Sequence, residues 1–79
     1  MRKEVNIDCV TQLSYMWRNG EELRAVGSVD MGDFVVPCII VYEEYPFFDY
    51  RPEDEQEPEI AMVSVIIKDG AFAGEYDII

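Results

Sequence analysis

The sequence contains no histidine, only two cysteines and only 6 basic residues in a chain of 79. Without histidine there is no imidazole general base, no Ser-His or Cys-His nucleophile pair and no histidine-ligated metal. The two cysteines, Cys9 and Cys38, form no CxxC motif, and each lies in an apolar run. We expect both to be small buried thiols of a reducing compartment, and not the two halves of a disulfide.

Long hydrophobic segments are also missing. The longest predominantly apolar run, residues 60–67, is too short to cross a bilayer. Two bases, Arg2 and Lys3, stand near the N-terminus, but Asn6 and Asp8 interrupt the stretch behind them, so the apolar region of a signal peptide is absent. The sequence therefore predicts a soluble, cytoplasmic protein that does not act at a membrane.

What the chain does contain is acid. Its 17 acidic residues outnumber the bases and give a net charge of −11, while hydrophobic residues make up 49% and aromatic residues 13%. A disordered acidic tail would be poor in both classes, so we expect a folded domain. The length allows one domain over residues 1–79. A chain this acidic is not expected to bind nucleic acid directly by neutralising phosphates.

Alternating apolar residues predict a mainly β or α+β fold with a small antiparallel sheet of four to six strands. The expected turns lie at residues 30–33 and at residues 69–70. Pro37 lacks an amide donor and is therefore expected at a sheet edge or a bulge. The strands are expected at residues 3–8, 22–29, 34–42, 60–68 and 71–79.

Residues 9–18 fit two structures. As one short helix, the segment is capped by Asp8 and closed by Asn19 and Gly20. As a strand, it uses Asn19 and Gly20 as a type I′ turn into the next strand. The strand places Leu13, Tyr15 and Trp17 on one face, and this aromatic content favours it.

The strands expected at residues 34–42 and 60–67 are apolar on both faces. A sheet with one wet face would alternate more cleanly, so the second face needs a cover. Three covers are compatible with the sequence: a helix from residues 9–18, a sheet curled on itself, or a second subunit or other hydrophobic partner, which includes a homodimer.

Residues 23–41 contain Arg-Ala, a small residue, Ser and an apolar residue, then Phe-Val-Val and an alternating Ile/Val strand. This run resembles the central hairpin of the stage V sporulation protein G family of septation regulators, and residues 45–48 with Pro52 are similar to its following turn. The resemblance implies an antiparallel sheet, a dimer and a nucleic-acid-binding regulator. Two features depart from the family: its C-terminal helix is absent, and residues 53–59 carry no base. The bases available to such a regulator are Arg2, Lys3, Arg18, Arg24, Arg51 and Lys68.

An acidic segment, residues 43–59, holds eight acids, one base and three prolines, so it carries −7 of the net charge. We expect it to be an extended loop. Within it, glutamates at every second position from 53 to 59 would place carboxylates about 6.7 Å apart on one side of an extended chain. That interval is similar to the separation of successive phosphates in a nucleic-acid strand.

These features predict a non-enzymatic binding or inhibitor protein without cofactor or metal, whose acidic surface engages a basic partner such as a nucleic-acid-binding enzyme. By type the chain resembles small acidic phage anti-defence proteins (anti-CRISPR or anti-restriction) and nuclease immunity proteins. Residues 49–54 lack the glycine of an EF-hand, so no calcium site is expected. The alternatives are a solvated connector, a subunit of a larger assembly and the dimeric regulator above. The predicted partner-binding residues are Glu43, Glu44, Asp49, Glu53, Asp54, Glu55, Glu57 and Glu59 for charge, with Tyr45, Phe47, Phe48 and Tyr50 as apolar anchors.

Overall fold

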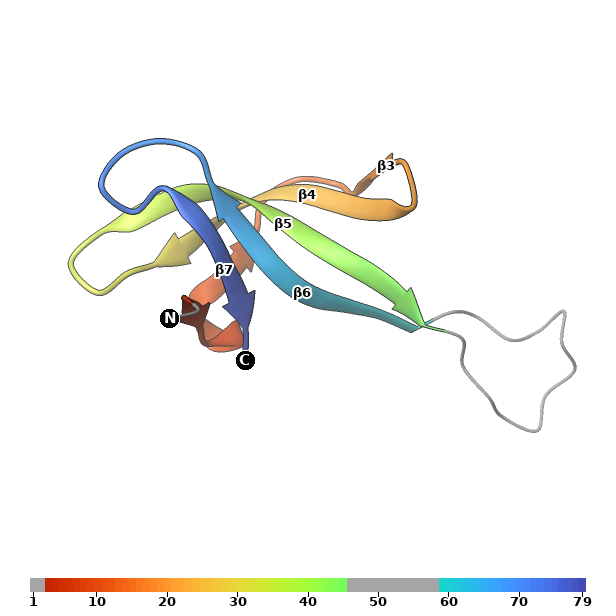
Figure 1. The fold of residues 1–79 in the computed structure, drawn as a ribbon, viewed down its shortest axis with the longest axis horizontal. Helices are drawn as coiled ribbons and strands as arrows, with labels where there is room; N and C mark the ends of the chain where they lie inside the picture. Colours follow the sequence, from red (N-terminus) through yellow and green to blue (C-terminus); the bar gives the residue numbers. More distant parts are fainter. Residues whose placement is uncertain (1–2, 46–58) are drawn as a thin grey trace, which may run out of the picture.

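The computed structural model describes residues 3–45 and 59–79, in which seven strands form one strongly curled sheet (Figure 1). The spatial order is β1-β7-β6-β5-β4-β2, with β3 on the same edge of β4 as β2. All pairs are antiparallel except β1 with β7, so the predicted mainly β fold is confirmed and the sheet is mixed. The elements are β1 (Glu4–Val5), a 3-10 turn η1 (Ile7–Cys9), β2 (Val10–Gln12), β3 (Trp17–Asn19), β4 (Glu22–Asp30), β5 (Val35–Tyr45), β6 (Glu59–Ile67) and β7 (Gly74–Ile78).

Residues 10–12 and 17–18 of the ambiguous segment 9–18 lie in strands β2 and β3, so the helix alternative is wrong. β2 and β3 both pair with β4, with Gln12 opposite Gly27 and Trp17 opposite Arg24. Residues 13–16, which connect β2 to β3, lie along only two residues of β4, Ala25 and Val26. Here Leu13 N and Ser14 N both donate to Val26 O, at 2.9 and 3.2 Å, and the Ser14 hydroxyl accepts from Val26 N. The interrupted strand thus satisfies the edge of β4, which a helix would leave unpaired.

The turn between β3 and β4 differs from the predicted type I′. Asn19 pairs with Glu22, so the two loop residues are Gly20 and Glu21. Gly20 has φ +65°, and no non-glycine residue has positive φ among the described residues. One positive φ at the first loop position is the pattern of a type II′ turn. The turn at residues 30–33 is confirmed: Met31 N donates to Phe34 O at 2.8 Å.

The two terminal strands are shorter than predicted. β6 ends at Ile67, which pairs with Gly74, so residues 68–73 form a wide loop and not a tight turn at residues 69–70. Phe72 packs against the core within that loop, and its carbonyl accepts a hydrogen bond from the Tyr76 hydroxyl at 2.7 Å. At the N-terminus, the Asn6 side chain accepts from Asp8 N and starts the 3-10 turn, which ends β1.

Pro37 lies at an edge of β5, as predicted. It pairs with Ser28 of β4, whereas pairing of β5 with β6 begins at Ile39. The Met31–Phe34 hydrogen bond fixes the alternation along the β4–β5 ladder, so the nitrogen of Pro37 faces away from β4, towards the side of β6. Because this nitrogen has no hydrogen to donate, the β5–β6 ladder does not extend to it.

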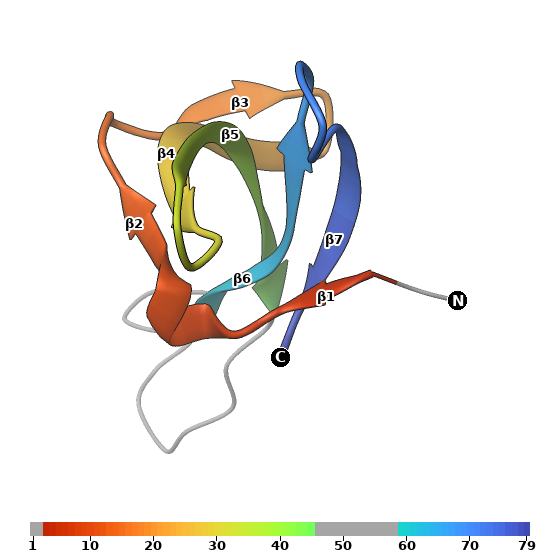
Figure 2. The same ribbon diagram turned by 90° about the vertical axis from the view of Figure 1, so that its left-hand side faces the viewer.

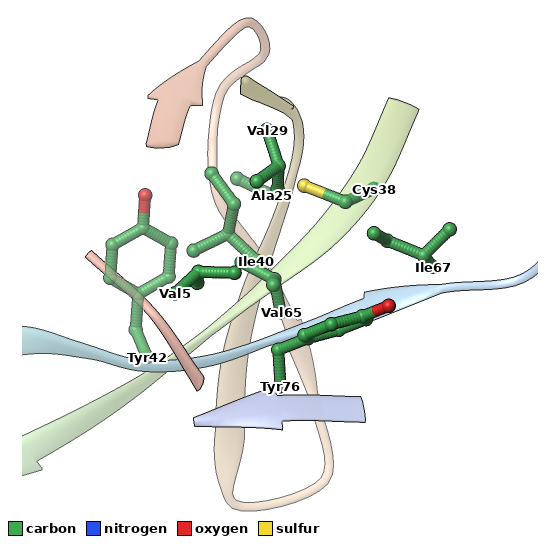
Figure 3. Packing of buried hydrophobic residues seen from close by; sticks show 9 residues of the cluster. All are labelled: Val5, Ala25, Val29, Cys38, Ile40, Tyr42, Val65, Ile67 and Tyr76. Atoms are coloured by element: carbon green, nitrogen blue, oxygen red, sulfur yellow. The ribbon is translucent and has the colours of Figure 1, made fainter. Parts of the chain in front are cut away.

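The curl of the sheet encloses a single core (Figure 2). Ala25, Ile40 and Val65 sit on neighbouring strands at 0% exposure, and the curl is the cover for this inner face. Gly27 permits the close packing, because a Cβ there would lie 2.4 Å from Ile40 Cδ1 and 2.5 Å from Thr11 O. Nine residues form the cluster (Figure 3): Val5, Ala25, Val29, Cys38, Ile40, Tyr42, Val65, Ile67 and Tyr76.

β5 and β6 continue past the core as a two-stranded arm that ends at the pair Tyr45–Glu59 (Figure 1). A bulge between Val41 and Tyr42 of β5 gives β6 one extra residue, which increases the local twist. Glu43, Glu44 and Glu59 therefore belong to strands, and the expectation that the whole of residues 43–59 is a loop is wrong at both ends. None of the helical structure in residues 3–45 and 59–79 is long and apolar enough to span a membrane.

Candidate functional site

The predicted partner-binding residues fall on and beyond the end of the arm. Only four of them lie within the described residues: Glu43, Glu44, Tyr45 and Glu59. Glu59 is also the only described member of the glutamate row at positions 53 to 59. The other eight predicted residues lie outside the described part of the chain: Phe47, Phe48, Asp49, Tyr50, Glu53, Asp54, Glu55 and Glu57.

Strand register brings three of the four together on one face of the arm. Tyr45 is directly opposite Glu59, which implies Cβ atoms about 4.5–5.5 Å apart, and Glu43 follows at the alternate position. The Tyr45 hydroxyl donates to Glu43 Oε2 at 2.7 Å, and this hydrogen bond raises the pKa of Tyr45. All three residues are exposed, so the arm presents two carboxylates beside an aromatic ring.

Glu44 does not join this group. As the neighbour of Glu43 in a strand it points to the opposite face of the arm, the face continuous with the core residue Tyr42. There its carboxylate accepts from Arg18 Nη2 at 2.5 Å. Its charge is therefore partly neutralised within the molecule.

Sequence reasoning missed other residues on the face that carries Glu43 and Glu59. This outer face continues over β4, where Arg24 lies opposite Trp17 and donates to the Glu22 carboxylate at 3.2 Å. It also reaches β7, where the exposed Glu75 lies opposite Ile66. The period-2 alternation of each strand indicated which of its residues share a side. Only the register between strands brings the residues of β4, β5, β6 and β7 onto one surface.

An apolar row crosses the same outer face: Val26, Ile39 and Ile66 lie directly opposite one another on β4, β5 and β6. Val26 is 40% exposed and the neighbouring Trp17 41%. The row borders a hollow of about 400 Å³ at the point where β6 leaves β5. The hollow is lined by Val26, Val36, Pro37, Cys38, Ile39, Ile66, Lys68, Asp69 and Gly70.

The described residues show no metal-ligand cluster and hold two thiols. Among them no group of three or more Cys, Asp or Glu side chains is arranged to hold a metal. Both cysteines are free thiols, with Cys38 buried and Cys9 half-buried. Burial raises the pKa of Cys38, which disfavours the nucleophilic thiolate. What remains is a surface of carboxylates, aromatic rings and aliphatic side chains.

Comparison of this chain with models of protein families, with curated proteins and with solved structures finds no match. The resemblance of residues 23–41 to the stage V sporulation protein G hairpin stays a prediction about β4 and β5. The geometry and charge of the outer face are the grounds for a functional proposal.

Proposed function

We propose that this chain is a non-enzymatic binding protein whose acidic surface engages a basic, nucleic-acid-handling protein and inhibits it, as anti-CRISPR, anti-restriction or nuclease immunity proteins do. The observation that carries this proposal is the concentration of charge: of a net −11, residues 43–59 contribute −7. Within the described residues, Glu43 and Glu59 extend this charge onto the outer face of the arm.

Electrostatics gives the proposal its mechanism. A particle of net charge −11 is drawn to a groove lined with Lys and Arg at a rate that falls as salt increases. Arginines of such a groove would form two parallel hydrogen bonds to a carboxylate, as they do to phosphate. Tyr45, 43% exposed beside these carboxylates, is of a residue type that often carries binding energy at protein interfaces.

Three of the four bases among the described residues already have partners, which disfavours the rival function, direct binding of nucleic acid; Lys68 is the fourth. Arg18 is paired with Glu44 and Arg24 with Glu22. Lys3 donates to Ala73 O and lies 5.3 Å from the centroid of the Tyr76 ring. These three cations already have partners inside the chain, so contact with phosphates would have to displace them.

Affinity capture from host lysate, with mass spectrometry of the captured protein, tests the proposal. The wild-type chain is compared with the double variant Glu43→Lys/Glu59→Lys. A control double variant, Asp8→Lys/Asp33→Lys, changes the net charge equally at exposed positions away from the arm. We expect the captured protein to be a nucleic-acid-binding protein. DNA or RNA is expected to compete with the chain for binding to this protein. The arm variant, but not the control variant, is expected to lose about tenfold or more in affinity for it.

Two results would contradict the proposal. One is equal loss of capture in the arm variant and the control variant, because the partner would then respond to the net charge of the chain and not to the position of the carboxylates. The other is tight binding of DNA or RNA by the chain itself in a gel-shift titration at low salt. That result would support the dimeric regulator.

A further inference from the structure

The apolar row Val26–Ile39–Ile66 lies on the outer face of a sheet whose core is already filled. Its members face one another across β4, β5 and β6, and Val26 remains 40% exposed. The adjoining hollow of about 400 Å³ is large enough for one or two side chains of a partner. Val26 is exposed and Ile39 and Ile66 are only half-buried, so part of the surface of this row is available for contact with another molecule.

Carboxylates flank this row along the same face. Towards the arm, Glu43 lies four residues beyond Ile39 in β5, and Glu59 lies opposite Tyr45. Towards β7, Glu75 lies opposite Ile66. Arg24 on this face is paired with Glu22, and the rim of the hollow carries one charge of each sign, Lys68 and Asp69. The surroundings of the apolar row are therefore net negative.

Two other occupants fit this surface less well. A strand added to the free edge of β5 would meet Pro37, which offers no donor on that side. A second copy of the chain would bring Glu43, Glu59 and Glu75 towards a surface of the same sign, with −11 on each molecule.

We propose that the outer face is the docking site for a basic partner segment that also carries apolar side chains. The apolar side chains enter the hollow beside Val26, Ile39 and Ile66, while lysines or arginines contact Glu43, Glu59 and Glu75. This inference rests on the proposed function, because it takes the partner to be basic. It adds that the affinity comes from the apolar row and the selectivity from the carboxylates.

Trp17 provides the readout, because it is the chain's single tryptophan and lies on this face opposite Arg24. The probes are two synthetic peptides of equal length and charge, one alternating lysine with leucine and the other lysine with serine. Each is titrated into the full chain at low salt while Trp17 emission is recorded. We expect the lysine–leucine peptide to bind about tenfold more tightly or better, because only this peptide buries apolar groups.

Two substitutions locate the binding. Val26→Gln is expected to weaken the lysine–leucine peptide about tenfold and to leave the lysine–serine peptide unchanged. Ile7→Gln is the matched control, because Ile7 is 48% exposed but lies in η1, away from the apolar row. Circular dichroism checks that both variants are folded, and Ile66→Thr, which keeps a β-branched side chain, provides a second test of the row.

The outcomes separate the docking site from the proposed function. Equal binding of the two peptides, with no effect of Val26→Gln or Ile66→Thr, overturns the docking site, as does absence of binding by either peptide. The proposed function is tested independently by the lysate comparison. Light scattering that shows a dimer which Val26→Gln dissociates also overturns the inference, because the face would then be occupied by a second copy.

Discussion

The two faces of β4, β5 and β6 consist of alternate residues from the same three segments, yet they differ in exposure. The outer face is closed only in part, since Val41 and Ser64 there are buried. On the inner face Ala25, Ile40 and Val65 are fully buried, whereas Val26 of the outer face is 40% exposed. The cause is the curl, which wraps the inner face around itself and leaves the outer face on the outside (Figure 2). An apolar residue in these strands therefore either fills the core or lies on the outer face, where Val26 is exposed.

The largest expected effect comes from truncating neighbouring isoleucines on opposite faces. Ile40→Ala is expected to lower the free energy of unfolding by about 4 kcal/mol, because Ile40 is at 0% exposure and its removal leaves a cavity. Ile39→Ala is expected to cost about 1 kcal/mol, because that side chain is only half-buried. Urea denaturation of both variants measures the difference. Equal losses would mean that the two faces are equally important to stability.

The next effect concerns the tightest approach on the inner face. Gly27→Ala is expected to cost about 2 to 3 kcal/mol, since its Cβ would meet Ile40 Cδ1 and the Thr11 carbonyl below van der Waals distance. Ser28→Ala, the adjacent position on the other face, is expected to cost less than about 1 kcal/mol. Thermal unfolding compares the two variants. If Gly27→Ala were tolerated, Thr11 of β2 and Ile40 of β5 would be able to move away from position 27 of β4 without loss of the fold.

The smallest effect is the contribution of two inner-face groups, Cys38 and Tyr42, to the pH dependence of stability. Burial raises the pKa of Cys38 above its ordinary value of 9.0. The pKa of Tyr42 is raised above its ordinary 10.0, mainly by burial and to a smaller extent by the charge of the nearby Cys38 thiolate. The folded state thus holds these protons more tightly, so its stability is complete below about pH 9 and falls as pH rises towards the raised values. Urea denaturation between pH 8 and about pH 11 is expected to show a shallower fall in Tyr42→Phe and Cys38→Ala. The outer-face variant Ile39→Ala should keep the wild-type slope, and a flattened slope there would contradict the assignment.

Local sequence patterns predicted much of the fold, and their failures have identifiable causes. Period-2 alternation and turn residues located β4, β5 and β6, and the missing donor of Pro37 predicted its edge position. The tight turn at residues 69–70 was wrong because Phe72 packs against the core and widens the loop. The parallel pairing of β1 with β7 joins the two ends of the chain, and no local pattern carries information about a contact of that range.

The acidic character of the candidate site could be predicted from the sequence, but the full set of residues that form it could not. The acidic segment was evident from the order of residues, and it led to Glu43, Tyr45 and Glu59. The same reasoning grouped Glu44 with them, although strand alternation turns it towards Arg18. Trp17, Val26 and Glu75 escaped notice because they come from three separate strands and become neighbours only through register.

By itself the sequence determined the chemistry: it excludes histidine-dependent catalysis, predicts a mainly β domain and places more than half of the net charge in residues 43–59. Composition and alternation are properties of single segments, so they can be determined without knowledge of the tertiary structure. The tertiary structure decided which apolar residues are core and which are surface. Ile39 and Ile40 are adjacent and chemically identical, and only the direction in which the sheet curls buries one fully and leaves the other beside the carboxylates.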